Sequence, residues 1–484
     1  MRRPFRTLLA ALSFAAALPA SAAPFQASAR VDTSAKGVRI APEIYGQFAE
    51  QLGTGINGGI WVGTDSAIPN INGYRRDVVE ALQALKVPVV RWPGGCFADI
   101  YHWHDGIGPR PERPVTLNKW WGNTEEANQF GTHEYFDFAE LIGARTYLNV
   151  NVGTGSAGEA KDWVEYVSSP SRSRLAQLRR SNGRDKPWKI DYVGIGNEMW
   201  GCGGNQRVEE FSPQVRSYAT FLKEDGTKLI AGGATGDDYH WTEALMASAR
   251  GFDEAAWRAT FVQTRRLETM IAGHDAVMDK VDPEAKVGLM VAEWGTWYDA
   301  TPGTNAAFLQ QENTLRDALV AATNFHIFHR HADRVRMANI AQMVNVLQAM
   351  ILTDGAKMAR TPTYYAFLMY RPFQGAEALP VQATVPDYGD KLPALDITAA
   401  RDAAGALQIA IVNVDPANEG ELLLDIGKRG AVTGEILTAP KMDSQNRPGG
   451  AEEVKPAPFA GAKWQSGKLR VRVPAKSLVR LTIN

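Results

Sequence analysis

Seven short apolar runs alternate with helix-like stretches between residues 40 and 360, and this alternation limits the fold more than any other feature. The runs lie at 40–48, 87–92, 146–152, 191–198, 228–232, 287–293 and within 343–352, with helical patterns at 77–85, 135–142 and 213–223. Short apolar strands that alternate with helices indicate a parallel α/β sheet. A chain of 484 residues has room for a (β/α)8 barrel and a second module. The sequence therefore predicts a TIM-type barrel.

The strand count falls one short of eight. Between Thr235 and Lys286 the sequence shows helical pattern and loop, without a convincing apolar strand. A closed (β/α)8 barrel needs a strand from this region. The count thus predicts a barrel with one strand missing or replaced.

The sequence pattern changes after about residue 360. Short strand-like runs at 407–414 and 469–473, the second of them alternating cleanly, are separated by turns rich in Gly and Pro. This pattern predicts a C-terminal antiparallel β-sandwich. We expect a strand within 24–39 to join it, the barrel to span 40–360 and the sandwich to span 361–484.

The first 23 residues have the pattern of a secretory signal peptide. Arg2, Arg3 and Arg6 give a positive start, residues 8–18 are apolar, and Ala20-Ser21-Ala22 is a small-residue cleavage site. No later segment is long and apolar enough to span a membrane. We therefore expect a secreted protein, periplasmic or extracellular, that is not inserted in a membrane.

Charge and cysteine content exclude some functions. The chain has 52 basic and 53 acidic residues, and its net charge of -1 provides no excess of positive charge for binding nucleic acid. The two cysteines, Cys96 and Cys202, are too few for a disulfide scaffold. Both follow Gly-rich turns after apolar strands, so they could lie near each other. Two free thiols are the favoured interpretation, and pairing remains open.

Three strand-like runs lead to a glutamate. Glu50 follows the first run, Glu198 ends the fourth in Asn197-Glu198, and Glu293 ends a later one in EWG. Side chains at the C-terminal ends of barrel strands point into one shared mouth. Two carboxyls facing one cleft are typical of a glycosidase, with one acid kept protonated and one ionised. The alternative is that each glutamate caps or salt-bridges locally.

Three other motifs have rival interpretations. The stretch 153–158 matches G-x-G-x-x-G, but no acidic residue ends a following strand, so an ordinary tight turn is favoured over a dinucleotide site. His326, His329 and His331 lie on a predicted helix, where neighbouring arginines favour a surface or interface role over a metal site. Arg91 ends the second strand and either braces a catalytic carboxylate or forms a structural ion pair.

The chain resembles the α-L-arabinofuranosidases of glycoside hydrolase family 51. The resemblance runs from about residue 40 into the sandwich and is carried by VVRWPGGCFADIYHWHDGIGPRPERP, VGIGNEMWGCGGN, VAEWGTWYD and HADRVRMANIAQMVNVLQAMILTDG. It implies a retaining glycosidase with Glu198 as acid/base and Glu293 as nucleophile. It also implies that the sugar is bound by Glu50, Phe48, Arg91, Asn197, Cys96, Trp121 and Gln342.

The implied chemistry needs two carboxyls and nothing else. Glu293 attacks the anomeric carbon while Glu198 protonates the departing oxygen, and Glu198 then deprotonates a water. Retaining enzymes hold the two carboxyls roughly 5–5.5 Å apart. We therefore expect no metal and no organic cofactor.

The chain departs from the family pattern at one place. Residues 236–243 match the segment before the family's sixth strand and 248–254 the segment after it, so that only Ala244 to Ala247 lie between. The sixth strand and its tyrosine are predicted to be deleted. The deletion leaves a second hypothesis open, a catalytically impaired sugar-binding homologue. Another retaining barrel glycosidase, such as a β-xylosidase or an endoglucanase, is a further alternative.

The resemblance also implies the partners. The expected substrate is an arabinose-containing oligo- or polysaccharide from hemicellulose or pectin. Family members tend to form homo-oligomers, often hexamers.

Overall fold

The computed structural model describes residues 23–223, 226–233, 252–389, 391–427 and 429–484. Two sequence-based predictions fall outside these residues. One is the signal segment at residues 1–22, and the other is the deletion at Ala244–Ala247.

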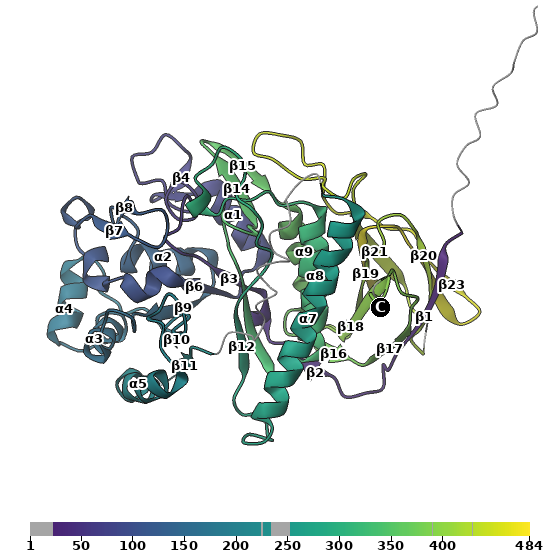
Figure 1. The fold of residues 1–484 in the computed structure, drawn as a ribbon, viewed down its shortest axis with the longest axis horizontal. Coiled ribbons are helices and arrows are strands. Elements are labelled where there is room, and N and C mark those ends of the chain that lie inside the picture. The colour runs from purple at the N-terminus through teal and green to yellow at the C-terminus, as the bar shows by residue number, and fades with distance from the viewer. Residues whose placement is uncertain (1–22, 224–225, 234–251, 390, 428) are drawn as a thin grey trace, which may run out of the picture.

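A parallel sheet of seven strands forms the core of the larger domain (Figure 1). Its order is β11-β10-β9-β6-β3-β13-β12, and every neighbouring pair is parallel. The strands are β3 (Gly46–Phe48), β6 (Val89–Trp92), β9 (Arg145–Val150), β10 (Tyr192–Ile195), β11 (Lys228–Ala231), β12 (Leu289–Trp294) and β13 (Val335–Ile340). The nearly closed sheet confirms the barrel prediction. In the described residues β11 and β12 are its two edges, and the loss of a sixth strand stays a prediction.

The last barrel strand differs from the prediction. The prediction places it within 343–352, whereas in the structure it is β13. The polar Arg336 and Asn339 interrupt the apolar pattern of β13, so the sequence does not show this segment as a strand. The apolar run at 343–352 is instead a buried loop that leads into β14. Val346 and Leu347 of this loop belong to one hydrophobic cluster with Phe48.

Helices follow most of the strands. They are α1 (Arg76–Leu85), α2 (Thr132–Ile142), α3 (Ala157–Ser168), α4 (Arg174–Ser181), α5 (Val208–Leu222), α7 (Glu254–Met278), α8 (Leu315–Arg330) and α9 (Pro362–Tyr370). The stretch resembling a dinucleotide motif is a tight turn whose Ser156 caps α3 by accepting the Glu159 N–H. Helix α5 begins before the predicted Pro213, because the Glu210 carboxylate accepts the Arg207 N–H at its start.

Short 3-10 helices and hairpins complete the barrel domain. The 3-10 helices are η1 (Pro42–Tyr45), η2 (Cys96–Ile100), η3 (Trp103–Gly106), η4 (Arg110–Glu112), η5 (Ala306–Phe308) and η6 (Arg371–Phe373). The hairpins pair β4 (Asn70–Ile71) with β5 (Tyr74–Arg75), β7 (Thr116–Asn118) with β8 (Thr124–Glu126), and β14 (Ile351–Asp354) with β15 (Lys357–Arg360). Helix α9 packs on α8 and α1, so the barrel domain extends beyond residue 360.

The smaller domain is a β-sandwich. One sheet has the order β17 (Val381–Thr384), β1 (Phe25–Val31), β20 (Gly420–Asp425), β24 (Lys468–Val473), β23 (Ala462–Gln465). The other has the order β2 (Val38–Arg39), β16 (Glu377–Leu379), β18 (Leu395–Arg401), β19 (Leu407–Asn413), β25 (Ser477–Ile483), β21 (Val432–Leu437), β22 (Ala457–Pro458). All pairs are antiparallel except β1 with β20. The alternation in β24 buries Leu469, Val471 and Val473 in the core between the sheets.

Helix α8 packs between the barrel and the sandwich, and its histidines belong to this interface (Figure 1). His326 contacts the Asp396 carboxylate at 3.2 Å and the Tyr370 hydroxyl at 2.5 Å. His329 contacts the hydroxyl of Tyr45, from the barrel, and that of Thr398, from the sandwich. Burial lowers the pKa of both histidines. The interface interpretation therefore holds in place of the metal site.

None of the described helices combines the length and apolar character that crossing a membrane requires.

Asp396 offers a test of this interface. It is buried and pairs with Arg265 and Arg330 as well as His326. Asp396→Ala removes the buried carboxylate that pairs with Arg265 and Arg330, while Arg330 keeps its pair with Glu268, so we expect the free energy of unfolding to fall by about 3 kcal/mol. Urea denaturation measures it. The matched control is Glu419→Ala, which breaks a more exposed pair with Arg472 and should cost less than about 1 kcal/mol. Equal losses in both variants would contradict the assigned role of Asp396.

Candidate active site

The three predicted glutamates lie at the C-terminal ends of their strands. Glu50 follows β3, Glu198 follows β10, and Glu293 is the penultimate residue of β12. These strands are not neighbours in the sheet. Because the C-terminal ends of parallel strands open on one mouth, the three carboxyls face the same cleft.

Arg91, on β6, connects the residues of this cleft. Its guanidinium donates to Oε1 of Glu293 at 2.7 Å and to Oδ1 of Asn197 at 2.5 Å. Its side chain is 1% exposed, and the guanidinium lies 4.6 Å from the ring centroid of Phe48. Arg91 therefore braces a carboxylate of the cleft, and at the same time forms a buried ion pair.

Glu50 is held by three donors. The Phe97 N–H and the Trp121 indole N–H both donate to Oε1 at 2.9 Å, and the Gln342 amide donates to Oε2 at 3.1 Å. Gly94 lies so close that a Cβ there would be 2.6 Å from Cγ of Glu50. The structure thus brings together Glu50, Trp121 and Gln342, which the sequence predicted as sugar-binding residues.

Glu198 has an unusual backbone conformation. Its φ of 42° lies in the left-handed region, which residues other than glycine seldom adopt. A tight turn holds it there, because the Gly201 and Gly203 N–H groups donate to its carbonyl at 2.7 and 3.1 Å. Strained backbone of this kind clusters at functional sites.

The two cysteines form a disulfide, so the favoured prediction of free thiols was wrong. Their Cα atoms are 5.5 Å apart, and 106 positions separate them in the sequence. Cys202 lies in the turn after Glu198, which follows β10, and Cys96 lies in the loop after β6, so the disulfide joins loops of two strands that β9 separates in the sheet. The sulfurs of Cys202 and Cys96 lie 3.5 and 4.0 Å from Oε2 of Glu198.

The carboxyls of the cleft differ in their electrostatic surroundings. Burial raises the pKa of Glu198 to about 7, with a further increase from the charge of Glu293. Burial and the same charge raise the pKa of Glu50 to about 7, against the hydrogen bonds from Phe97 and Trp121. Glu293, in contrast, is paired with the Arg91 cation. The cleft thus holds one paired carboxylate beside two carboxyls, Glu198 and Glu50, that are about half protonated near neutral pH.

The site residues differ in their exposure to solvent. The side chain of Glu293 is 30% exposed, and Glu198, Cys96 and Trp121 are also partly exposed, whereas Glu50, Phe48, Arg91, Asn197 and Gln342 are buried. Trp200 and Trp297, which follow the two acids in sequence, are 42% and 44% exposed. The partly exposed groups of the site are therefore the two carboxyls, Cys96 of the disulfide and the Trp121 indole.

Sequence reasoning missed Asp99. This buried residue accepts the N–H groups of Val152 and Gly153 at Oδ1 and that of Asn197 at Oδ2. It therefore fixes the backbone just before the acid/base candidate. The sequence feature that could have indicated Asp99 is its position three residues after Cys96, in the loop that follows a barrel strand.

Within the described residues, the only group of metal-ligating side chains close enough to share an ion is Cys96, Glu198 and Cys202. Its two sulfurs are bonded to each other. A disulfide has no thiolate to offer a metal, so this group is not a metal site in the oxidised protein.

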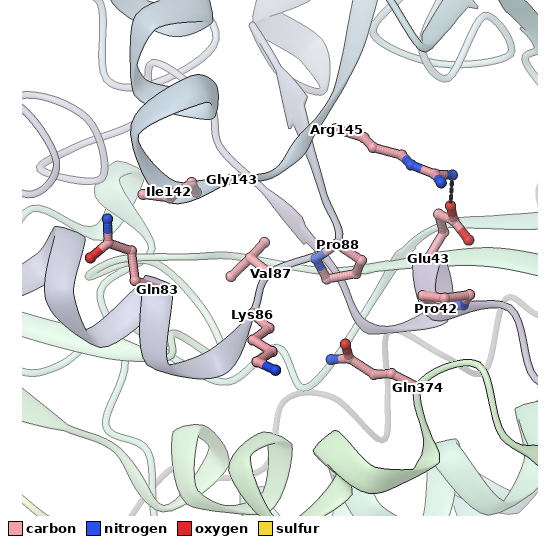
Figure 2. A pocket seen from close by; sticks show the side chains of 10 residues that line it. All are labelled: Pro42, Glu43, Gln83, Lys86, Val87, Pro88, Ile142, Gly143, Arg145 and Gln374. Atoms are coloured by element: carbon pink, nitrogen blue, oxygen red, sulfur yellow. Dashed lines mark hydrogen bonds and ion pairs between the residues drawn. The ribbon is translucent and has the colours of Figure 1, made fainter. Parts of the chain in front are cut away.

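A second hollow, of about 380 Å³, lies at the other end of the barrel (Figure 2). Its lining includes Glu43 and Pro88, which lie at the N-terminal ends of β3 and β6. Glu43 pairs there with Arg145. This end of a barrel serves stability rather than chemistry, and the hollow contains one carboxylate that is already paired.

Comparison with known proteins identifies the family. The models described as the α-L-arabinofuranosidase 1 domain and the α-L-arabinofuranosidase C-terminal domain match residues 81–263 and 292–477. An intracellular exo-α-L-arabinofuranosidase of Bacteroides ovatus is 44% identical and covers 98% of this chain and 99% of its own. The chain belongs to the α-L-arabinofuranosidases of glycoside hydrolase family 51.

Solved structures agree with this assignment. The family 51 arabinofuranosidase from Xanthomonas axonopodis pv. citri has a TM-score of 0.90 and 48% identity, covering 95% of this chain and 99% of its own. The Thermotoga maritima α-L-arabinofuranosidase, solved as an arabinose complex, has a TM-score of 0.84 and 28% identity, covering 94% and 99%. The resemblance stated from the sequence motifs is confirmed.

The comparison corrects the predicted localisation. The Bacteroides relative, which matches nearly the whole chain, is named an intracellular enzyme, so the expectation of secretion is contradicted. The aligned span of 511 positions also exceeds the 484 residues of this chain. The relative therefore has residues without a counterpart here.

The raised pKa of Glu198 predicts a cost in stability. An acid with a pKa raised from 4.5 to about 7 binds more protons folded than unfolded, so its destabilising effect grows as pH rises between these values. We expect Glu198→Gln to raise the melting temperature at pH 8, with a smaller gain at pH 5. Differential scanning calorimetry measures this, with Glu209→Gln, an exposed acid on α5, as control. A gain independent of pH would contradict the assignment.

Proposed function

We propose that this arabinofuranosidase releases terminal α-L-arabinofuranosyl residues with retention of configuration, through a covalent glycosyl-enzyme. The observation that carries the mechanism is the difference between its two carboxyls. Glu293 is held beside a buried guanidinium at 2.7 Å, while burial keeps Glu198 partly protonated near neutral pH. This is the division of charge that a nucleophile and an acid require.

In the first step Glu293 acts as the nucleophile. One of its oxygens attacks the anomeric carbon, the bond to the leaving group breaks, and Glu198 gives its proton to the departing oxygen. The Arg91 guanidinium holds the attacking carboxylate in place. The proposal includes a carboxyl separation of roughly 5–5.5 Å, and one beyond about 7 Å would contradict it.

In the second step Glu198 acts as a base. It takes a proton from water, whose oxygen attacks the anomeric carbon and displaces Glu293. The glycosylated Glu293 is neutral, which removes one cause of the raised pKa of Glu198. Glu198 therefore tends to carry its proton before glycosylation, when it must act as an acid, and to be ionised after it, when it must act as a base.

The remaining residues would bind the sugar. Glu50, oriented by Trp121 and Gln342, offers its carboxylate to sugar hydroxyls. Arg91 donates a hydrogen bond to Asn197 as well as to the nucleophile, so it holds Asn197 beside the nucleophile. There the Asn197 amide can reach the 2-hydroxyl of the sugar. Phe48 and Cys96 complete the proposed subsite as parts of its wall.

The substrate class follows from the family. We propose an arabinose-containing oligo- or polysaccharide, in line with the name of the Bacteroides relative and with the arabinose complex of the Thermotoga enzyme. The assembled cleft disfavours the impaired sugar-binding homologue, since both acids and Arg91 are in place. Comparing the rates of hydrolysis of aryl arabinofuranosides and aryl xylosides distinguishes an arabinofuranosidase from a β-xylosidase.

The homo-oligomer stays a prediction, and sedimentation velocity checks it.

The first test is hydrolysis of 4-nitrophenyl α-L-arabinofuranoside. We expect Glu293→Ala to lower kcat by more than about 10⁴-fold, since it removes the nucleophile. Glu198→Ala should lower it by about 10²- to 10⁴-fold, and added azide should restore turnover of an activated substrate by replacing the water that needs a base. An inactive wild type that still binds arabinose would overturn the proposed function.

The second test is the pH dependence. Glu198 must be protonated to act as an acid, and its pKa is about 7, so kcat/KM should fall as pH rises above about 7. In Glu198→Ala the residual activity on 4-nitrophenyl α-L-arabinofuranoside should lack this alkaline decline, because the titrating acid is gone. A decline that persists in the variant would assign the acid to another residue.

A further inference from the structure

We propose that the Cys96–Cys202 disulfide is a positioning group for Glu198, and that its reduction specifically slows protonation of the leaving group. The inference rests on the proposed acid/base role of Glu198. It concerns a bond that the mechanism above does not use.

The disulfide joins the two loops that form the wall beside the acid. Cys202 lies four residues after Glu198, within the turn that holds the left-handed backbone of that residue. Cys96 begins η2, next to the Phe97 N–H that donates to Glu50. The bond therefore ties the backbone that carries the acid to the backbone that orients the sugar-binding carboxylate.

Within the described part of the chain, the sulfurs are the polar atoms that approach the Glu198 carboxyl within hydrogen-bonding range. They lie 3.5 and 4.0 Å from its Oε2, and the Asn197 amide donates weakly to Sγ of Cys202 at 3.7 Å. Among the described residues, no N–H or hydroxyl group donates to this carboxyl. Since neither sulfur of a disulfide carries a proton, they confine Glu198 by contact alone.

Reduction changes both the tether and the chemistry. The charged groups that face Glu198 are Glu293 from β12, Arg91 from β6 and Glu50 after β3, and reduction leaves these unchanged. The new thiols, however, are hydrogen-bond donors, which stabilise the ionised carboxylate and lower its pKa. A freed loop also lets the carboxyl leave its productive position, and a displacement of about 1 Å can cost 10²-fold in rate.

The reaction is a thiol–disulfide exchange with a dithiol. A thiolate of the dithiol attacks one sulfur, the Cys96–Cys202 bond breaks, and the other sulfur leaves as a thiolate and takes a proton. The second thiol of the reagent then resolves the mixed disulfide, giving two cysteine thiols and a cyclic disulfide. Both cysteines are partly exposed at the cleft, so the reagent can reach them. The chain has two cysteines in all, so this bond is its single target.

The test compares two substrates before and after treatment with dithiothreitol. For 4-nitrophenyl α-L-arabinofuranoside we expect kcat/KM to fall by about tenfold on reduction, with the alkaline limb of its pH profile at lower pH. For the dinitrophenyl arabinofuranoside, whose leaving group needs no proton, kcat/KM should change less than about twofold. Bound arabinose should slow the reduction, because the sugar covers the cleft.

Two variants serve as controls. Cys202→Ala should reproduce the reduced enzyme on both substrates, and Cys96→Ala/Cys202→Ala should not respond to dithiothreitol at all. Equal losses on the two substrates, with or without loss of the circular dichroism signal, would overturn the proposal, because they indicate a general structural role. Unchanged rates after complete reduction, verified by thiol titration, would also overturn it. Inactivity of the oxidised enzyme on both substrates would instead refute the proposed function.

Discussion

The guanidinium of Arg91 holds the cleft together. It lies on β6, yet it donates to Asn197, which follows β10, and to Glu293, on β12. An isolated buried cation is costly, and Arg91 is tolerated because a carboxylate and an amide oxygen accept its hydrogen bonds while Phe48 and Tyr147 lie near its faces. The same contacts that satisfy Arg91 therefore set the positions of Asn197 and of Glu293, the proposed nucleophile.

This arrangement has a cost in stability. Glu50 and Glu198 are held where burial and the charge of Glu293 raise the pKa of each to about 7, so their ionised forms are disfavoured. Only one of the three glutamates is paired with the guanidinium. An active site that needs an acid of raised pKa cannot also be the most stable packing of its residues.

The sequence predicted those features that depend on local pattern. Glu198 and Glu293 stand out because each ends an apolar run and is followed by tryptophan and glycine, and parallel strands bring such ends together. The prediction misplaced β13 because the polar Asn339 interrupts its apolar pattern. The loop after β13 is apolar because it is buried by tertiary packing, so it resembles a strand in sequence. The disulfide and the role of Asp99 depend on contacts between loops far apart in sequence, which no local pattern contains.

The proposed nucleophile, Glu293, lies on an edge strand, so its position depends strongly on Arg91. In the described sheet β12 pairs with β13 alone, so hydrogen bonds support it on one side. Glu293 is nevertheless tied across the barrel to β6 by an ion pair at 2.7 Å. The other site residues come from β3, β6 and β10 with the loops that follow them, from the β7–β8 hairpin and from the loop after β13, whereas the opposite edge strand, β11, contributes none. The catalytic geometry is thus carried by contacts inside the barrel, and it depends less on how the sheet closes between β11 and β12.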